Sequence, residues 1–175
     1  MDAQALGFFL DASPRRQYNF AHSLDEIRTP SHREALSLLE SWKAAVEHGG
    51  FVIGRHFPSR KFAQVLPNVL LLERVEGARD FRVRLAGFTM LCYYGVELRK
   101  RRLSEFFEGI EHENLYKLFD GILRSGRPSL AKSRMDKGRS SALQREIVSL
   151  PVLASDGRTP QVLVASFWND RYWLN

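Results

Sequence analysis

The chain has 175 residues, of which 44% are apolar and 11% aromatic, so a single domain can bury a hydrophobic core of its own. No apolar run approaches the roughly 20 residues that a membrane-spanning helix needs, because the longest candidate, Val65 to Leu72, is broken by Pro67 and Asn68. The first ten residues carry neither a positive charge nor a cleavage-site pattern, so they do not read as a signal peptide. We therefore expect a cytoplasmic protein without a membrane span. A single cysteine excludes an internal disulfide.

The formal net charge of +6 and the sequence pI near 9.8 raise the question of nucleic-acid binding. Basic residues are scattered from Arg15 to Arg171 with acidic residues between them, and only Arg99 to Arg102 form a dense run. A solvated basic turn is the simpler interpretation of that run. The alternative is a nucleic-acid-binding module that uses Arg99 to Arg102.

Residues 1–30 show no sustained hydrophobic period, so we interpret them as an N-terminal extension of a domain that comprises residues 31–175. Ser31 and Glu34 then have the spacing of a capping box, which predicts the start of a helix. An apolar stripe at three- and four-residue intervals continues this helix up to Gly49-Gly50. The stripe consists of Ala35, Leu38, Leu39, Trp42, Ala45 and Val46.

The middle of the chain predicts first strands and then helices. The runs Val69 to Val75 and Phe81 to Leu85 flank the turn residues Glu76-Gly77 and predict a hairpin. Residues 88–107 predict short helical turns, and a long helix is predicted from about Glu111 to Arg124.

Three further strands are predicted at residues 129–135, 143–153 and 161–168, and Asp156-Gly157 is a hairpin signal between the last two. The order of elements predicts an α+β fold. We expect a five-stranded antiparallel sheet with helices on one face and an N-terminal helical extension.

Several phrases carry a resemblance to a known family: residues 66–73 (LPNVLLLE), 81–87 (FRVRLAG) and 94–98 (YGVEL), together with Trp42, Gly49-Gly50, Arg55 and Pro58. They resemble a bacterial family of single PAS domains common in alphaproteobacteria. After the Gly-x-Glu step this family usually has Thr-Gly, whereas Arg99-Lys100 stands here. The resemblance implies a curved antiparallel sheet against helices, frequent dimerisation through an N-terminal helix, and a cavity that holds a small ligand or is filled by side chains.

No pattern predicts catalysis or a metal site. None of the five histidines stands beside a nucleophile motif, and no Cys/His spacing suits a metal. His112 lies between Glu111 and Glu113, but adjacent residues of a helix point in different directions. Neither haem nor flavin is supported, so the cofactor stays unknown. A small enzyme with a ketosteroid-isomerase-like fold would need a polar dyad that we do not find.

A binding cavity between the sheet and its covering helices is the better functional hypothesis. Residues at this spacing also form plain core, and that alternative stays open. The candidate ligand-binding residues are Arg84, Thr89, Tyr93, Tyr94, Leu115 and Phe119.

The apolar stripe of the first helix has two possible partners, its own sheet or a second copy of the chain. We expect a homodimer, and the candidate interface residues are Leu38, Leu39, Trp42 and Val46. The function predicted is a non-catalytic sensory or regulatory PAS domain that acts by ligand binding or protein contacts in bacterial signal transduction. A kinase or a cyclic-dinucleotide enzyme is the expected signalling partner, and nucleic acid is not expected.

Overall fold

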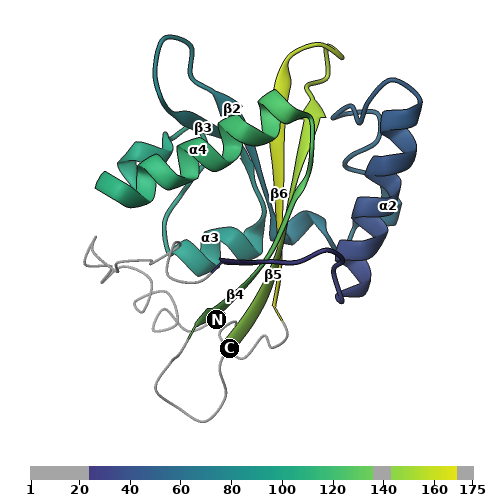
Figure 1. The fold of residues 1–175 in the computed structure, drawn as a ribbon, viewed down its shortest axis with the longest axis horizontal. Coiled ribbons are helices and arrows are strands. Elements are labelled where there is room, and N and C mark those ends of the chain that lie inside the picture. Colours follow the sequence, from purple (N-terminus) through teal and green to yellow (C-terminus); the bar gives the residue numbers. More distant parts are fainter. Residues whose placement is uncertain (1–23, 136–142, 169–175) are drawn as a thin grey trace, which may run out of the picture.

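The computed structural model describes residues 24–135 and 143–168, which form a six-stranded antiparallel sheet with helices on either side (Figure 1). The order of strands across the sheet is β1-β4-β5-β6-β2-β3. The strands are β1 (Leu24–Glu26), β2 (Val69–Arg74), β3 (Phe81–Ala86), β4 (Ser129–Met135), β5 (Leu143–Leu153) and β6 (Pro160–Trp168). The helices are α2 (Arg33–Glu47), α3 (Phe88–Tyr94) and α4 (Gly109–Ser125), with 3-10 turns η1 (Arg60–Phe62), η2 (Leu66–Asn68) and η3 (Leu103–Glu105).

The predicted α+β class is therefore confirmed, and the helices and strands lie close to their predicted ranges. Two features differ from the expectation. Residues 24–26, which we interpreted as part of an extension, add a sixth strand beside β4. The helices also occupy both faces of the sheet: α2 lies on one side, and α3 and α4 lie on the other (Figure 1). Within the described residues, no helix has the length and apolar character needed to cross a bilayer.

The central strands are buried on both faces, which explains their continuous apolar sequence. In β6, Leu163 and Ala165 pack in the core beneath α2, whereas Val162 and Val164 pack in the core beneath α3 and α4. Because successive side chains of a strand point to opposite faces, a strand covered on both sides needs apolar residues at consecutive positions. The run Val69 to Leu72 in β2 follows the same rule.

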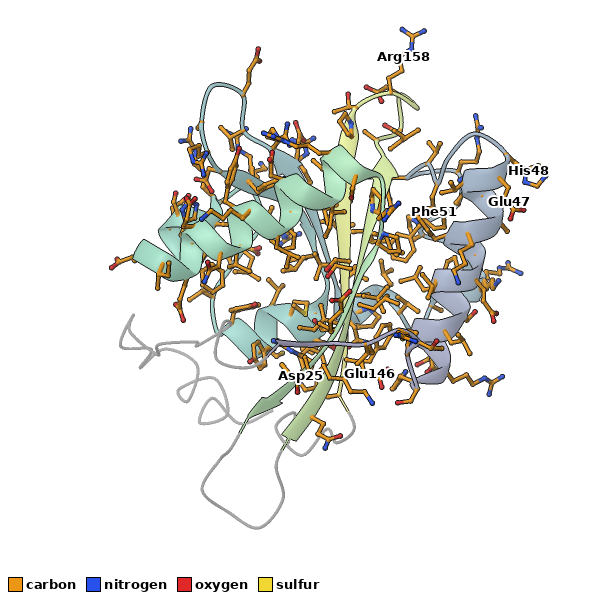
Figure 2. The ribbon with its side chains drawn as sticks, viewed as in Figure 1. Asp25, Glu47, His48, Phe51, Glu146 and Arg158 are labelled. Carbon is orange, nitrogen blue, oxygen red and sulfur yellow. The ribbon has the colours of Figure 1, made fainter. Side chains whose placement is uncertain are left out.

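The N-terminus of α2 is held by a carboxylate from the sheet. The predicted capping box does not form, because α2 has no side-chain cap at its N-terminal residue, His32. Glu146 of β5 instead accepts hydrogen bonds from the backbone N–H of Ser31 at 2.9 Å, from that of His32 at 3.0 Å and from the Ser31 hydroxyl. Figure 2 shows Glu146 near the point where the chain enters α2. A negative charge at this end also interacts favourably with the helix dipole.

Gly87 allows the close approach of α3 to the turn before β2. Its φ of −73° is open to any residue, so its role is steric. A Cβ atom at this position would lie 2.3 Å from the backbone oxygens of Leu66 and Pro67. Only a hydrogen atom fits at this position. This explains why the segment FRVRLAG ends in a glycine.

We predict that Gly87→Ala lowers the free energy of unfolding by about 1–3 kcal/mol, because backbone atoms cannot yield to the methyl group as a side chain would. Gly121→Ala in α4 is the matched control, since a Cβ there meets nothing within 4 Å and alanine is the better helix former. Urea unfolding of both variants measures the difference. Equal stability of the two variants would contradict this account.

Candidate functional site: a cavity beneath α4

A cavity of about 190 Å³ lies between α4 and the β1–β4–β5–β6 part of the sheet. Its polar lining residues are Glu26, Ser129 and Ser149. The apolar lining comes from α4 and the sheet and consists of Leu118, Phe119, Leu130, Ala131, Ile147 and Val164. A mostly apolar hollow with a few convergent polar groups is the usual form of a small-molecule site.

The strand register explains why there is space at this point. Glu26, Ala131 and Ile147 stand opposite one another on β1, β4 and β5. The next row across the same face contains Ser129 and Ser149. Ala131, Ser129 and Ser149 are small, so they leave space between these rows and the residues of α4.

The polar groups of the cavity lie on three different strands. Glu26 lies on β1 at the edge of the sheet and is exposed, Ser129 lies on β4, and Ser149 lies opposite Ser129 on β5. Ser149 also pairs with the apolar Val164 of β6. The charged group therefore lies at the solvent-facing β1 edge, whereas Phe119 and Val164 are buried.

Of the six candidate ligand-binding residues, Phe119 alone lines this cavity. Thr89, Tyr94 and Leu115 are buried in the core on the same face of the sheet. Tyr93 packs against Trp168, with 5.4 Å between ring centroids. The role of these residues in binding stays a prediction.

Arg84 lies on the surface instead of at the edge of the cavity. Leu71 pairs with Leu85 and Leu72 pairs with Val83, so Arg84 is the extra residue of a β-bulge. Its guanidinium pairs with Glu73 at 3.0 Å, and its side chain is 54% exposed.

Sequence reasoning missed the small polar residues of the sheet. The alternation Ser129-x-Ala131-x-Ser133 in β4 places three small side chains on one face. This pattern was a usable signal for a hollow, because small residues in a covered strand leave space beneath the helix. Glu26 carried no such signal, since three residues of edge strand are too short for a period to be recognised.

A buried arginine lies one row further along the same face. Arg145 is 2% exposed, and its Nε donates to the Ser133 hydroxyl at 3.2 Å. Its guanidinium lies 5.3 Å from the ring centre of Tyr93 and 5.8 Å from that of Trp168, within the range of cation–π attraction. Arg145 does not line the cavity.

The candidate dimer residues lie mostly inside the chain's own core. Leu38, Leu39 and Trp42 are buried against the sheet, and the indole N–H of Trp42 donates to the Pro151 carbonyl at 2.7 Å. Val46 is 45% exposed. The apolar stripe of α2 therefore packs on its own sheet, and a homodimer through this helix stays a prediction.

The basic run forms a turn along the outer edge of β3. The N–H of Lys100 donates to the Val83 carbonyl, and the Val83 N–H donates to the Arg101 carbonyl. Lys100 has a φ of +68°, a left-handed conformation that glycine adopts most easily. Lys100 stands at the position where the resemblance noted above implies the glycine of Thr-Gly.

Two cations of this run are paired locally. Arg99 binds Glu97 through two nitrogens, at 3.0 and 2.8 Å. These hydrogen bonds lower the pKa of Glu97 to about 2. Arg101 pairs with Glu105 at 2.9 Å. The local acids reduce the positive potential that a nucleic-acid backbone would meet.

Asp80 gathers three parts of the chain around one buried carboxylate. It accepts hydrogen bonds from the Phe81 N–H, from the hydroxyl of Ser104 at 2.6 Å, and from Nε2 of His112 at 3.1 Å. Burial alone would raise the pKa of Asp80, but the hydrogen bonds from Ser104, His112 and Phe81 outweigh it, so the pKa lies below its ordinary value. The carboxylate joins the start of β3, η3 and the first turns of α4.

Ser104, Asp80 and His112 are the residue types of a hydrolytic triad, but their order in space is wrong. In a triad the histidine lies between the acid and the nucleophile, where it takes the proton of the hydroxyl. Here the aspartate lies in the middle and binds both partners. This cluster therefore holds elements together and does not activate Ser104.

A second hollow, at the C-terminal end of α2, is open to solvent and satisfies its polar groups internally. Lys61 donates to the Ser41 hydroxyl at 2.6 Å, and Nδ1 of His56 accepts from the Val52 N–H at 2.8 Å. Over the ranges 24–135 and 143–168, no group of three or more His, Cys, Asp or Glu side chains could hold a metal ion.

The lowered pKa of Asp80 predicts a pH-dependent contribution to stability. Because the folded pKa lies below the unfolded one, this contribution is complete at pH values above about 4 and is lost as the pH falls through the folded pKa. We expect Asp80→Asn to cost about 1–3 kcal/mol at pH 7 and progressively less below pH 4. Urea unfolding between pH 7 and pH 3 measures this, with Glu76→Gln in the exposed β2–β3 turn as the control. If Asp80→Asn lowers the unfolding free energy by the same amount at every pH from 7 to 3, this account is contradicted.

Comparison with known proteins identifies the family to which the chain belongs. A search of curated proteins found no match. A family model described as a PAS domain matches residues 31–165, which include α2, α3, α4 and every strand except β1, apart from the last residues of β6. The chain belongs to the PAS domain family.

Proposed function

We propose that the chain is a non-catalytic sensory domain that binds a small molecule beneath α4 and passes its state to another protein. PAS domains are generally sensory modules without catalysis of their own, and they commonly mediate protein contacts. The observation that carries the proposal is the cavity of about 190 Å³, because the strands that line it also hold α2.

Two short paths connect the cavity with α2. Glu26 lines the cavity at the end of β1, and the chain runs from there into α2 through residues 27–32. In β5, Ile147 lines the cavity while its neighbour Glu146 binds the start of α2 from the opposite face. A ligand that shifts β1 or β5 would therefore change how α2 is seated, which is the coupling a sensor needs.

The signalling context is an expectation of the same proposal. A domain of this kind acts through contacts, in a bacterial cytoplasm, on a partner such as a kinase or a cyclic-dinucleotide enzyme. The outer surface of α2, which includes the exposed Val46, is the surface that we assign to contacts with a second copy of the chain. The local pairing of Arg99 and Arg101 favours this function over nucleic-acid binding.

We predict that the wild-type chain carries a small molecule in this cavity. Native mass spectrometry of freshly purified protein should show a mass excess that disappears on denaturation. Ala131→Leu fills the space, so this variant should lose the excess mass and gain about 1 kcal/mol in unfolding free energy. A wild-type chain with no retained molecule, and with no binder in a fragment screen followed by NMR, would contradict the proposal.

We also predict that the full-length chain is a homodimer through α2. Light scattering at micromolar concentration should give the mass of two chains. Val46→Asp places a charge on the exposed side of α2 and should give monomers, whereas Ile110→Asp, at a position 71% exposed on α4, should leave the dimer intact. A monomeric wild-type chain would end the dimer hypothesis without affecting the cavity.

A further inference from the structure

The charge of the cavity wall indicates which molecules it admits. Glu26 is the sole charged residue among the lining residues, and no lysine, arginine or histidine lines the cavity. In the part of the chain that the structure describes, Glu26 takes part in none of the ion pairs. Glu26 is exposed at the edge of the sheet, so its carboxylate attracts cations and repels anions with the modest strength of a surface charge.

Two basic side chains of β4 and β5 are engaged elsewhere. Lys132 follows Ala131 in β4, so it points to the opposite face of the sheet, where its Nζ lies 3.3 Å from Glu146. On the cavity face, Arg145 is enclosed one row away by Tyr93, Trp168 and Ser133. Neither residue pairs with Glu26, which gives the lining an acidic group in a chain whose formal net charge is +6.

The size of the cavity and its hydrogen-bonding groups narrow the class of possible ligands further. A cavity of roughly 150 Å³ in another protein accommodates one benzene ring, so about 190 Å³ holds one ring or a short alkyl chain with a small arm. The lining offers acceptors, namely the carboxylate of Glu26 on β1 and the hydroxyls of Ser129 on β4 and Ser149 on β5. An alkylammonium group has three N–H donors and no acceptor, so it matches the carboxylate at the β1 edge.

We propose that the cavity binds a small primary amine, with its ammonium group at Glu26 and its apolar body against Phe119, Ile147 and Val164. This inference rests on the proposed ligand-binding function and adds the chemical class of the ligand. The same carboxylate rejects molecules of that size that carry a negative charge.

The test is an NMR titration of the full-length chain with three probes of one shape: 2-phenylethylamine, 2-phenylethanol and phenylacetate, at neutral pH and low salt. We expect all three probes to shift the amide resonances of residues in β4, β5 and α4. The Kd of the amine should be about three- to fivefold lower than that of the alcohol, as for a partly exposed ion pair, and phenylacetate should bind most weakly.

The variant Glu26→Gln should raise the Kd of the amine to that of the alcohol and leave the Kd of the alcohol within twofold. The matched control is Asp25→Asn, because Asp25 neighbours Glu26 on β1 but pairs in register with Lys132 and so faces the other side of the sheet. This control should leave the preference for the amine intact.

The outcomes separate the inference from the function on which it rests. If the alcohol or phenylacetate binds as tightly as the amine, or if Glu26→Gln leaves the preference unchanged, the amine class is overturned and the ligand cavity stands. If no probe binds and the purified chain carries no retained molecule, both the inference and the proposed function fail.

Discussion

Burial of the central strands on both faces is the constraint on which the other features of this structure depend. With α2 on one side and α3 and α4 on the other, the central parts of β2, β5 and β6 are buried on both faces. When a close-packed strand shifts toward the helix on one face, its contacts with the helix on the other face change as well. The cavity beneath α4 and the seat of α2 therefore lie on two sides of the same sheet, and in the function that we propose this packing would transmit a change from one to the other.

Buried carboxylates set the positions of the helices. Burial alone would raise the pKa of Glu146, but hydrogen bonds from Ser31 and His32 outweigh it, and the pKa lies below its ordinary value. Glu146 thus stabilises the start of α2 as an ion, and Asp80 does the same for η3 and the first turns of α4. Both acids join segments that are far apart in sequence, so they determine tertiary arrangement more than local structure.

The helix and strand predictions depended on local periodicity, and there they were accurate. The interval of three and four residues identified α2, and the same signal identified α4 with Phe119 on its buried side. The sequence carries no sign of the bulge in β3, because a regular strand would place Val83 and Leu85 on one face. The extra residue Arg84 sends them to opposite faces. The capping box failed for a related reason, since a carboxylate 115 residues away takes the place of the local one.

The sequence by itself determined the fold class, the ranges of the helices and strands, and the resemblance to PAS domains, because patterning and turn residues act over a few neighbouring positions. The tertiary structure alone decided that α2 covers its own sheet, that Glu26 joins the sheet on β1, and that the small residues of β4 and β5 meet beneath α4. These features depend on which strands become neighbours and in which register, and register is set by the packing of the whole sheet between its helices, which no local stretch of sequence encodes.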